Sequence, residues 1–181
     1  TAGNDGSDGG SVTLGGIGAN GGLYLDSVVI DTSAADTADA AGLLTISGSL
    51  SPVIAVAGTS GGNQDLAGIT LNGRLSLAPG STLTLRTNPG LVAGLSSRAI
   101  DVRQADFISA TGLVFDTSGG NLSGVAGHVL LGDVGLTTRP SSLLVDTRGT
   151  TSSGHFILND GDGATTQTEV HVDGNLDVRN T

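Results

Sequence analysis

The stretch that decides the fold is ITLNGRLSL, from Ile69 to Leu77. Its apolar residues occupy every second position on both sides of Gly73, which is the pattern of a strand with one buried face. Because glycine has no Cβ, Gly73 allows a tight corner at which the same face of the chain stays inward. The stretch therefore predicts two short β-strands joined at a glycine corner, as in one coil of a β-solenoid.

The same pattern recurs in the chain. VHVDGNLDV, from Val170 to Val178, repeats it position for position, and LTISGSL, from Leu44 to Leu50, is a shorter copy. Other alternating strands are expected at Leu23–Leu25, Leu83–Leu85, Ile100–Val102 and Leu143–Val145. Glycines at 48, 73, 124, 149 and 174 are 25, 51, 25 and 25 residues apart, so they keep a rough spacing of 25 residues with one glycine of the series absent. A coil of about 20–25 residues is therefore predicted, which is a usual length for a parallel β-helix.

The composition supports an all-β chain and excludes several other classes. Glycine supplies 31 of the 181 residues, too many for long helices, and the stretch from Ala34 to Leu43 is expected to be a loop with at most one helical turn. The competing architecture, a β-sandwich, fits less well because aromatic residues make up only 2% of the chain. There is no cysteine, which excludes a disulfide scaffold. The net charge of -10 makes binding to nucleic acid unfavourable, and no apolar run is long enough to insert into a membrane.

Three strings carry a resemblance to a known family type. They are GGSVTLGGIGANGGLYLDS (9–27), GITLNGRLSLAPGSTLTLRT (68–87) and TEVHVDGNLDVRNT (168–181). These strings resemble the filamentous-haemagglutinin-type β-helical proteins of bacteria, which include two-partner-secreted adhesins, autotransporter passengers and S-layer-like β-strand-repeat proteins. The resemblance implies a right-handed parallel β-helix that is exported to the cell surface. It also implies a role as an adhesin, a filament or a surface layer.

These observations give an expectation for the whole chain. Residues 1–181 are expected to form a single β-solenoid domain, a segment of a longer secreted protein of the bacterial cell surface or matrix. We expect a non-catalytic structural or adhesive protein that forms a rod or filament. Its expected partners are further copies of itself, end to end or laterally, with host or surface glycans as a further class. The ends of a solenoid are open sheet edges, so they must be capped or docked.

Calcium is the one metal for which the sequence offers ligands. Asp160 and Asp162 lie in NDGDG, residues 159–163, where carboxylates on a glycine-rich turn could bind Ca²⁺. The pair Asp5 and Asp8 lies in a similar but weaker context. Asp-Gly sequences are also simply good turns, so the expectation is no cofactor, with calcium and a calcium-dependent surface-layer module left open.

An enzyme is the other alternative, since many parallel β-helices degrade polysaccharides as lyases or hydrolases. Glycoside hydrolysis needs two carboxylates at a fixed separation, and the candidates are Asp101, Asp106, Asp116, Asp146, Asp173 and Asp177. The chain has few aromatic residues for a sugar platform and no lysine, so no catalytic residue is predicted. The histidines at 128, 155 and 171 are expected at the surface. The motifs GIGANG (16–21) and GTSGG (58–62) resemble nucleotide-binding and hydrolase motifs, but the expected neighbouring elements are strands rather than helices.

Overall fold

The computed structural model describes residues 11–15, 23–25, 27–33, 42–47, 50–60, 64–87, 94–108, 112–119, 123–134, 138–159 and 168–180. These residues contain fourteen strands and no helix. The strands are β1 (Val12–Gly15), β2 (Leu23–Leu25), β3 (Val28–Asp31), β4 (Leu43–Ser47), β5 (Val53–Val56), β6 (Ala67–Leu77), β7 (Thr82–Thr87), β8 (Ala99–Val102), β9 (Ala105–Phe107), β10 (Gly112–Asp116), β11 (Val129–Leu131), β12 (Ser142–Asp146), β13 (Phe156–Leu158) and β14 (Asn175–Arg179).

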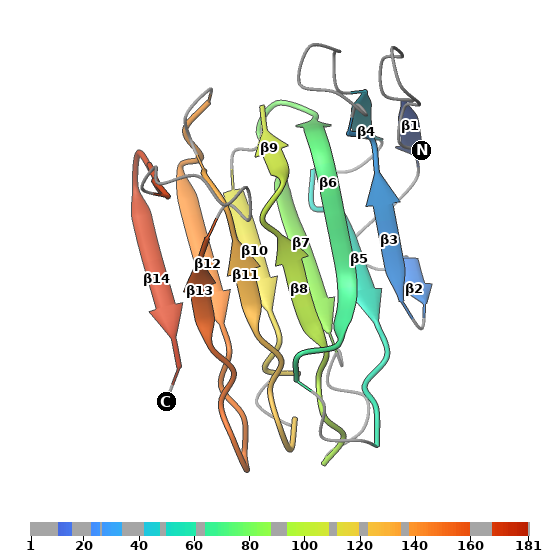
Figure 1. Ribbon diagram of the computed structural model, residues 1–181. Helices are drawn as coiled ribbons and strands as arrows, with labels where there is room; N and C mark the ends of the chain where they lie inside the picture. Colours follow the sequence, from blue (N-terminus) through green and yellow to red (C-terminus); the bar gives the residue numbers. More distant parts are fainter. Residues whose placement is uncertain are drawn as a thin grey trace.

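The strands form a parallel β-solenoid, as predicted. One sheet has the order β14-β12-β10-β7-β5-β2, and the other follows β1-β4-β6-β8-β11-β13, with β3 and β9 also paired to β6. All pairings between the named strands are parallel. Figure 1 shows the coils following one another from β1–β3 at one end of the stack to β14 at the other. Four successive coils carry three strands each when the two parts of β6, before and after Gly73, are counted in successive coils, and β12, β13 and β14 continue the stack. The right-handed sense of winding stays a prediction.

The long strand β6 contains the predicted glycine corner. Its first part pairs with β3 in the preceding coil, and its last part, after Gly73, pairs with β4. Gly73 has a φ of 94°, a left-handed conformation that side chains with a Cβ rarely adopt. Ile69 and Leu71 before the corner and Leu75 and Leu77 after it are all buried. The alternating pattern and the glycine therefore act as predicted from the sequence.

The predicted coil length of 20–25 residues is wrong. In the sheet that contains β2, each residue lies beside one that is 30 to 33 positions further along the chain, through Leu23, Ile54, Leu85, Phe115, Val145 and Val178. The glycine spacing does not measure the coil because the two matching glycines sit at different corners. Gly73 lies inside β6, whereas Gly174 directly precedes β14, which belongs to the other sheet.

The second predicted copy of the corner is also only half correct. Leu176–Val178 lies within β14, as expected, but Val170–Val172 is not a strand. Val170 instead forms a single isolated bridge to Val134. A strand needs a continuous partner in the next coil, and sequence alternation alone does not supply one.

The core is a stack of aliphatic side chains, coil over coil. Leu83, Leu113 and Leu143 occupy equivalent positions on β7, β10 and β12, and all are at most 1% exposed. The neighbouring column contains Phe115, which is fully buried and lies 6.0 Å from Phe107 between ring centroids. These two phenylalanines thus lie in the core, as their apolar surroundings in the sequence indicated.

Buried threonines satisfy the backbone at one corner of the solenoid. Thr87 is the last residue of β7, and Thr117 and Thr147 directly follow β10 and β12; all three are fully buried. Their hydroxyls donate to the carbonyl oxygens of Arg98 (2.9 Å), Gly127 (2.7 Å) and Arg179 (3.3 Å). The polar corners are therefore paired inside the protein, as buried polar groups must be.

Two further expectations concern loops and membranes. Residues 34–41 of the predicted loop lie outside the described residues, and β4 begins at Leu43. Where the chain is described, it offers no helix with the length and apolar character to cross a membrane.

Candidate functional site

The predicted calcium ligands cannot be placed. Asp160 and Asp162 lie outside the described residues, as do Asp5 and Asp8. Over the ranges that the structure describes, no three histidine, cysteine, aspartate or glutamate side chains come together as a metal site would require. Calcium binding by Asp160 and Asp162 stays a prediction.

Aspartates near the ends of strands pair with a side chain two residues further on. Arg103 contacts Asp101, Arg148 contacts Asp146 and Arg179 contacts Asp177, each at 2.6 Å between Nη2 and Oδ2. The same arrangement occurs at Asp31 and Asp116, where a serine stands in place of the arginine and donates its backbone N–H and its hydroxyl to the aspartate. The five copies are Asp31-Thr32-Ser33, Asp101-Val102-Arg103, Asp116-Thr117-Ser118, Asp146-Thr147-Arg148 and Asp177-Val178-Arg179. These carboxylates hold the chain where it leaves a strand, as Asx turns do.

This repeated Asp-(Thr or Val)-(Ser or Arg) motif was visible in the sequence and was missed. It also accounts for four of the six aspartates considered as catalytic candidates. Of the other two, Asp173 lies 3.9 Å from Arg139, and Asp106 is half-buried beside Arg74. Burial raises the pKa of Asp106, and the charge of Arg74 offsets part of that shift.

The structure brings only two of these aspartates into neighbouring positions. Asp116 on β10 lies directly beside Asp146 on β12 in the register of the sheet. Arg86 donates to Asp116 at 2.9 Å, and Arg148 donates to both oxygens of Asp146. Burial acts to raise the pKa of Asp146, but the hydrogen bonds from Arg148 outweigh it and the pKa is lowered. Both carboxylates are therefore committed to arginine partners, an arrangement that suits a structural role better than proton transfer.

His128 forms a second cluster with Asp65 and His155. The expectation that it lies at the surface is wrong, because the structure buries it. It is 9% exposed, and its Nε2 lies 3.1 Å from Oδ1 of Asp65, which precedes β6, two strands away from β11 in the sheet. Its Nδ1 accepts the backbone N–H of His155 at 2.8 Å, and the two imidazole rings meet edge to face at 4.9 Å. Because Nδ1 is an acceptor, the proton of the neutral ring sits on Nε2 and points to Asp65. No serine takes part in these contacts, and Ser60 of the GTSGG motif is exposed in a bend.

The burial of His128 makes the stability of the folded protein depend on pH in a way that can be measured. Burial lowers its pKa below the ordinary 6.5, with His155 adding to the effect and Asp65 opposing it. The unfolded chain therefore binds a proton more readily than the folded one, so stability falls as the pH falls from about 6.5 toward the lowered pKa. We expect His128→Gln to remove this contribution to the pH dependence of the free energy of unfolding, measured by urea unfolding above and below pH ~6.5. His171→Gln, at a more exposed histidine paired with Glu169, is the control. An unchanged slope in His128→Gln contradicts the assignment.

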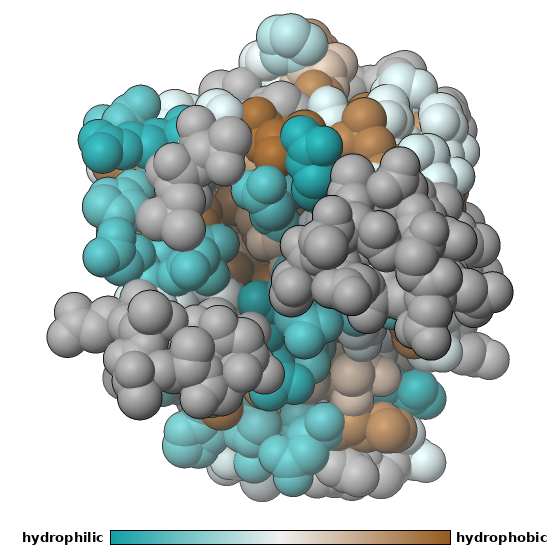
Figure 2. All heavy atoms as spheres, turned by 45° about the horizontal axis from the view of Figure 1, so that its top comes forward, coloured by the Kyte–Doolittle hydropathy of each residue, from teal (hydrophilic) through white to brown (hydrophobic). Residues whose placement is uncertain are grey.

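The end of the stack at β14 exposes apolar side chains that earlier coils bury. Leu176 is 55% exposed and Val178 is 43% exposed, whereas their register partners Leu143 and Val145 are at most 1% exposed. In the other sheet Leu158 on β13 is also exposed, at 46%. On the face in Figure 2, by contrast, hydrophobic residues surface only in small areas among hydrophilic ones. Among the described residues, nothing stacks on the core-facing side of this coil, and its apolar side chains stay exposed.

Comparison with family models, with characterised proteins and with solved structures gave no match for this chain.

Proposed function

We propose that this protein is a non-catalytic structural segment of a secreted bacterial surface or matrix protein, and that it assembles end to end into a rod. The observation that carries the proposal is the open end formed by β13 and β14. There Leu176 and Val178 stand in the same columns as the buried core residues of the preceding coils. A surface of this kind is completed by another coil of the same register.

The backbone at this end supports the same conclusion. β14 pairs with β12 on one side and is the last strand of its sheet, so one row of its N–H and C=O groups faces outward. An open parallel edge next to exposed aliphatic side chains is a template for strand addition. Full burial of an exposed leucine or valine contributes about 1.5–3 kcal/mol, so covering the half-exposed Leu176 and Val178 contributes roughly half of that each, which favours stacking over exposure.

The opposite end offers a matching surface. β1 is the first strand of its sheet and pairs with β4. Val12 and Leu14 on β1 are partly buried and pack against the core, so they extend its aliphatic column to this end. Stacking β14 and β13 of one copy on the first coil of the next would join two sheet edges that both carry aliphatic core side chains. An isologous contact between two β14 ends is disfavoured by comparison, because it would make only pairs.

The arrangement of charged residues supports a structural rather than a catalytic role. Five of the six aspartates that could form a hydrolase pair contact an arginine. The acidic, cysteine-free composition and the family resemblance support secretion to the cell surface, where host or surface glycans are the expected further partners.

We expect the double substitution Leu176→Lys with Val178→Lys to abolish assembly. Two ammonium groups at the open end would face the aliphatic first coil of the next copy and cannot be buried there without a large cost. Electron microscopy and sedimentation velocity over a range of protein concentrations measure the result. Leu50→Lys is the matched control, because Leu50 is 64% exposed but lies in the bend between β4 and β5.

The outcomes separate the alternatives. Fibres formed by the wild type and by Leu50→Lys, but not by the double variant, support end-to-end assembly. A wild type that stays monomeric at high concentration overturns it. Fibres that dissolve when a chelator is added would instead point to the calcium-dependent module.

A further inference from the structure

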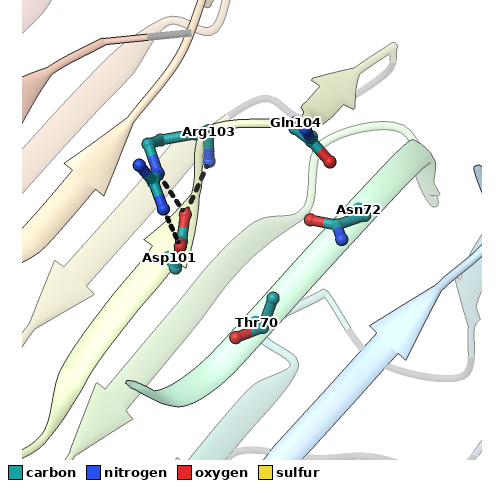
Figure 3. A pocket seen from close by; sticks show the side chains of 5 residues that line it. All are labelled: Thr70, Asn72, Asp101, Arg103 and Gln104. Atoms are coloured by element: carbon teal, nitrogen blue, oxygen red, sulfur yellow. Dashed lines mark hydrogen bonds and ion pairs between the residues drawn. The ribbon is translucent and has the colours of Figure 1, made fainter. Parts of the chain in front are cut away.

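A polar hollow of about 230 Å³ lies on the outside of the solenoid, over the pairing of β6 with β8 (Figure 3). It is lined by Thr70, Asn72, Asp101, Arg103 and Gln104. Figure 3 shows Thr70 and Asn72 on β6, and Asp101 on β8 with Arg103 and Gln104 on the turn that follows it. The hollow is not visible in the sequence, because its two sides come from different coils.

The solenoid fixes the geometry of the hollow. Thr70 lies directly beside Asp101 in the register of the two strands. Asn72 and Arg103 follow two residues later on each side, so all four residues share the outward face. Neighbouring strands are ~4.8 Å apart, and residues on one face recur every ~6.6 Å along a strand. The four side chains therefore form a small polar square on a rigid sheet, and Gln104 lies at its end.

The hollow has no net charge. Arg103 donates from Nε to Oδ1 of Asp101 at 2.9 Å, from Nη2 to Oδ2 at 2.6 Å, and from its backbone N–H at 3.2 Å. The hydrogen bond to Asp101 raises the pKa of Arg103, and the charge of the guanidinium compensates that of the carboxylate beside it. An added anion would have to compete with Asp101 for the guanidinium, and an added cation would have to compete with Arg103 for the carboxylate.

The remaining side chains offer both donors and acceptors. The hydroxyl of Thr70 and the amides of Asn72 and Gln104 can each donate and accept a hydrogen bond. The Asn72 side chain also hydrogen-bonds the carboxylate of Asp31, which lies beside it in the preceding coil. This contact holds the amide of Asn72 in place at the edge of the hollow.

We infer that this hollow binds one neutral saccharide unit. A ligand with several hydroxyl groups and no charge matches a lining that is polar throughout, electrically balanced and able both to donate and to accept. The volume is below the ~300–1,000 Å³ of sites for drug-sized ligands, so it suits a single monosaccharide unit of a longer glycan. No aromatic ring lines the described part of the hollow, so the affinity for one unit is weak, with a Kd on the order of 1 mM. Repetition along an assembled rod would strengthen attachment to a polysaccharide.

This inference rests on the proposed function in one respect, the glycan partners for which it names a site; it does not rest on end-to-end assembly, since the hollow belongs to a single chain. The test is ligand-observed saturation-transfer NMR, which works for monomers and for assemblies. The probes are methyl α-glucoside, methyl β-galactoside, N-acetylglucosamine and, as the charged counterpart, glucuronate. We expect a saturable signal from at least one neutral sugar and a weaker one from glucuronate.

Variants locate the binding. Asn72→Ala and Gln104→Ala each remove hydrogen bonds of ~1 kcal/mol, so each should weaken binding about threefold to tenfold. Asn175→Ala, at an exposed asparagine on β14, should bind like the wild type. Thermal unfolding of each variant confirms that the solenoid is intact. The inference is overturned if no neutral sugar gives a saturable signal, if only glucuronate binds, or if both hollow variants bind as the wild type does. Electron microscopy of the same samples reports assembly separately, so the two proposals fail independently.

Discussion

Replacing Phe115 with alanine is expected to lower the free energy of unfolding by about 3–5 kcal/mol. Phe115 is the largest fully buried side chain in the described part of the chain and lies within β10. Leu85 on one side and Val145 on the other occupy the same column in the neighbouring coils. Because both neighbours are held by parallel pairing with β10, they cannot move together to fill the space that the ring leaves. The loss therefore includes the cavity as well as the lost transfer of the ring from water.

The matched control is Val114→Ala on the same strand. Val114 is partly exposed and faces outward, so its truncation should cost at most about 1 kcal/mol. Urea unfolding followed by circular dichroism measures both variants. A loss of less than about 1 kcal/mol for Phe115→Ala would show that the coils close around the missing ring and that the core is not a fixed stack.

The strands that the sequence predicted are those in which apolar residues alternate, so that one face of the strand is turned to the core. The alternation at Leu83–Leu85, for example, lies within β7, and the alternation at Leu143–Val145 lies within β12. The length of a coil was not predictable in the same way. It depends on which strands lie side by side, and the connection from β7 to β8 carries no periodic pattern that reveals its length.

The contacts of side chains between coils were also hidden in the sequence. His128 has alternating apolar neighbours near it, yet it is buried, with Asp65 contacting it from two coils earlier and His155 from the next coil. The polar hollow likewise needs Thr70 and Asp101 to become neighbours across one full coil. The Asp-(Thr or Val)-(Ser or Arg) motif is the exception, since its members are two residues apart and recur in the sequence itself.

Gly73→Ala is expected to lower the free energy of unfolding by about 2–5 kcal/mol. Two costs add at this position. A residue with a Cβ is strained by roughly 1–2 kcal/mol at the φ of 94° that the corner requires. The added Cβ would also lie 2.3 Å from Oγ1 of Thr32 and 2.9 Å from the carbonyl carbon of the same residue, and overpacking of this kind costs about 1–3 kcal/mol.

The chain offers a control that separates these two costs. Gly80 has a φ of 81°, but a Cβ there would meet nothing within 4 Å. Gly80→Ala should therefore show the backbone strain alone, about 1–2 kcal/mol. Equal losses for the two variants, measured by urea unfolding, would contradict the packing argument.

The reason for an excess loss at Gly73 lies in the coils on either side. Thr32, in the preceding coil, donates its hydroxyl to the carbonyl oxygen of Asn72, and the N–H of Gly73 donates to the carbonyl oxygen of Gln104 in the following coil. A Cβ at Gly73 displaces Thr32 and so disturbs the stacking on one side, while the hydrogen bond to Gln104 prevents the corner from moving to the other. Three coils meet at this glycine, so the cost of filling it measures how tightly the solenoid is stacked.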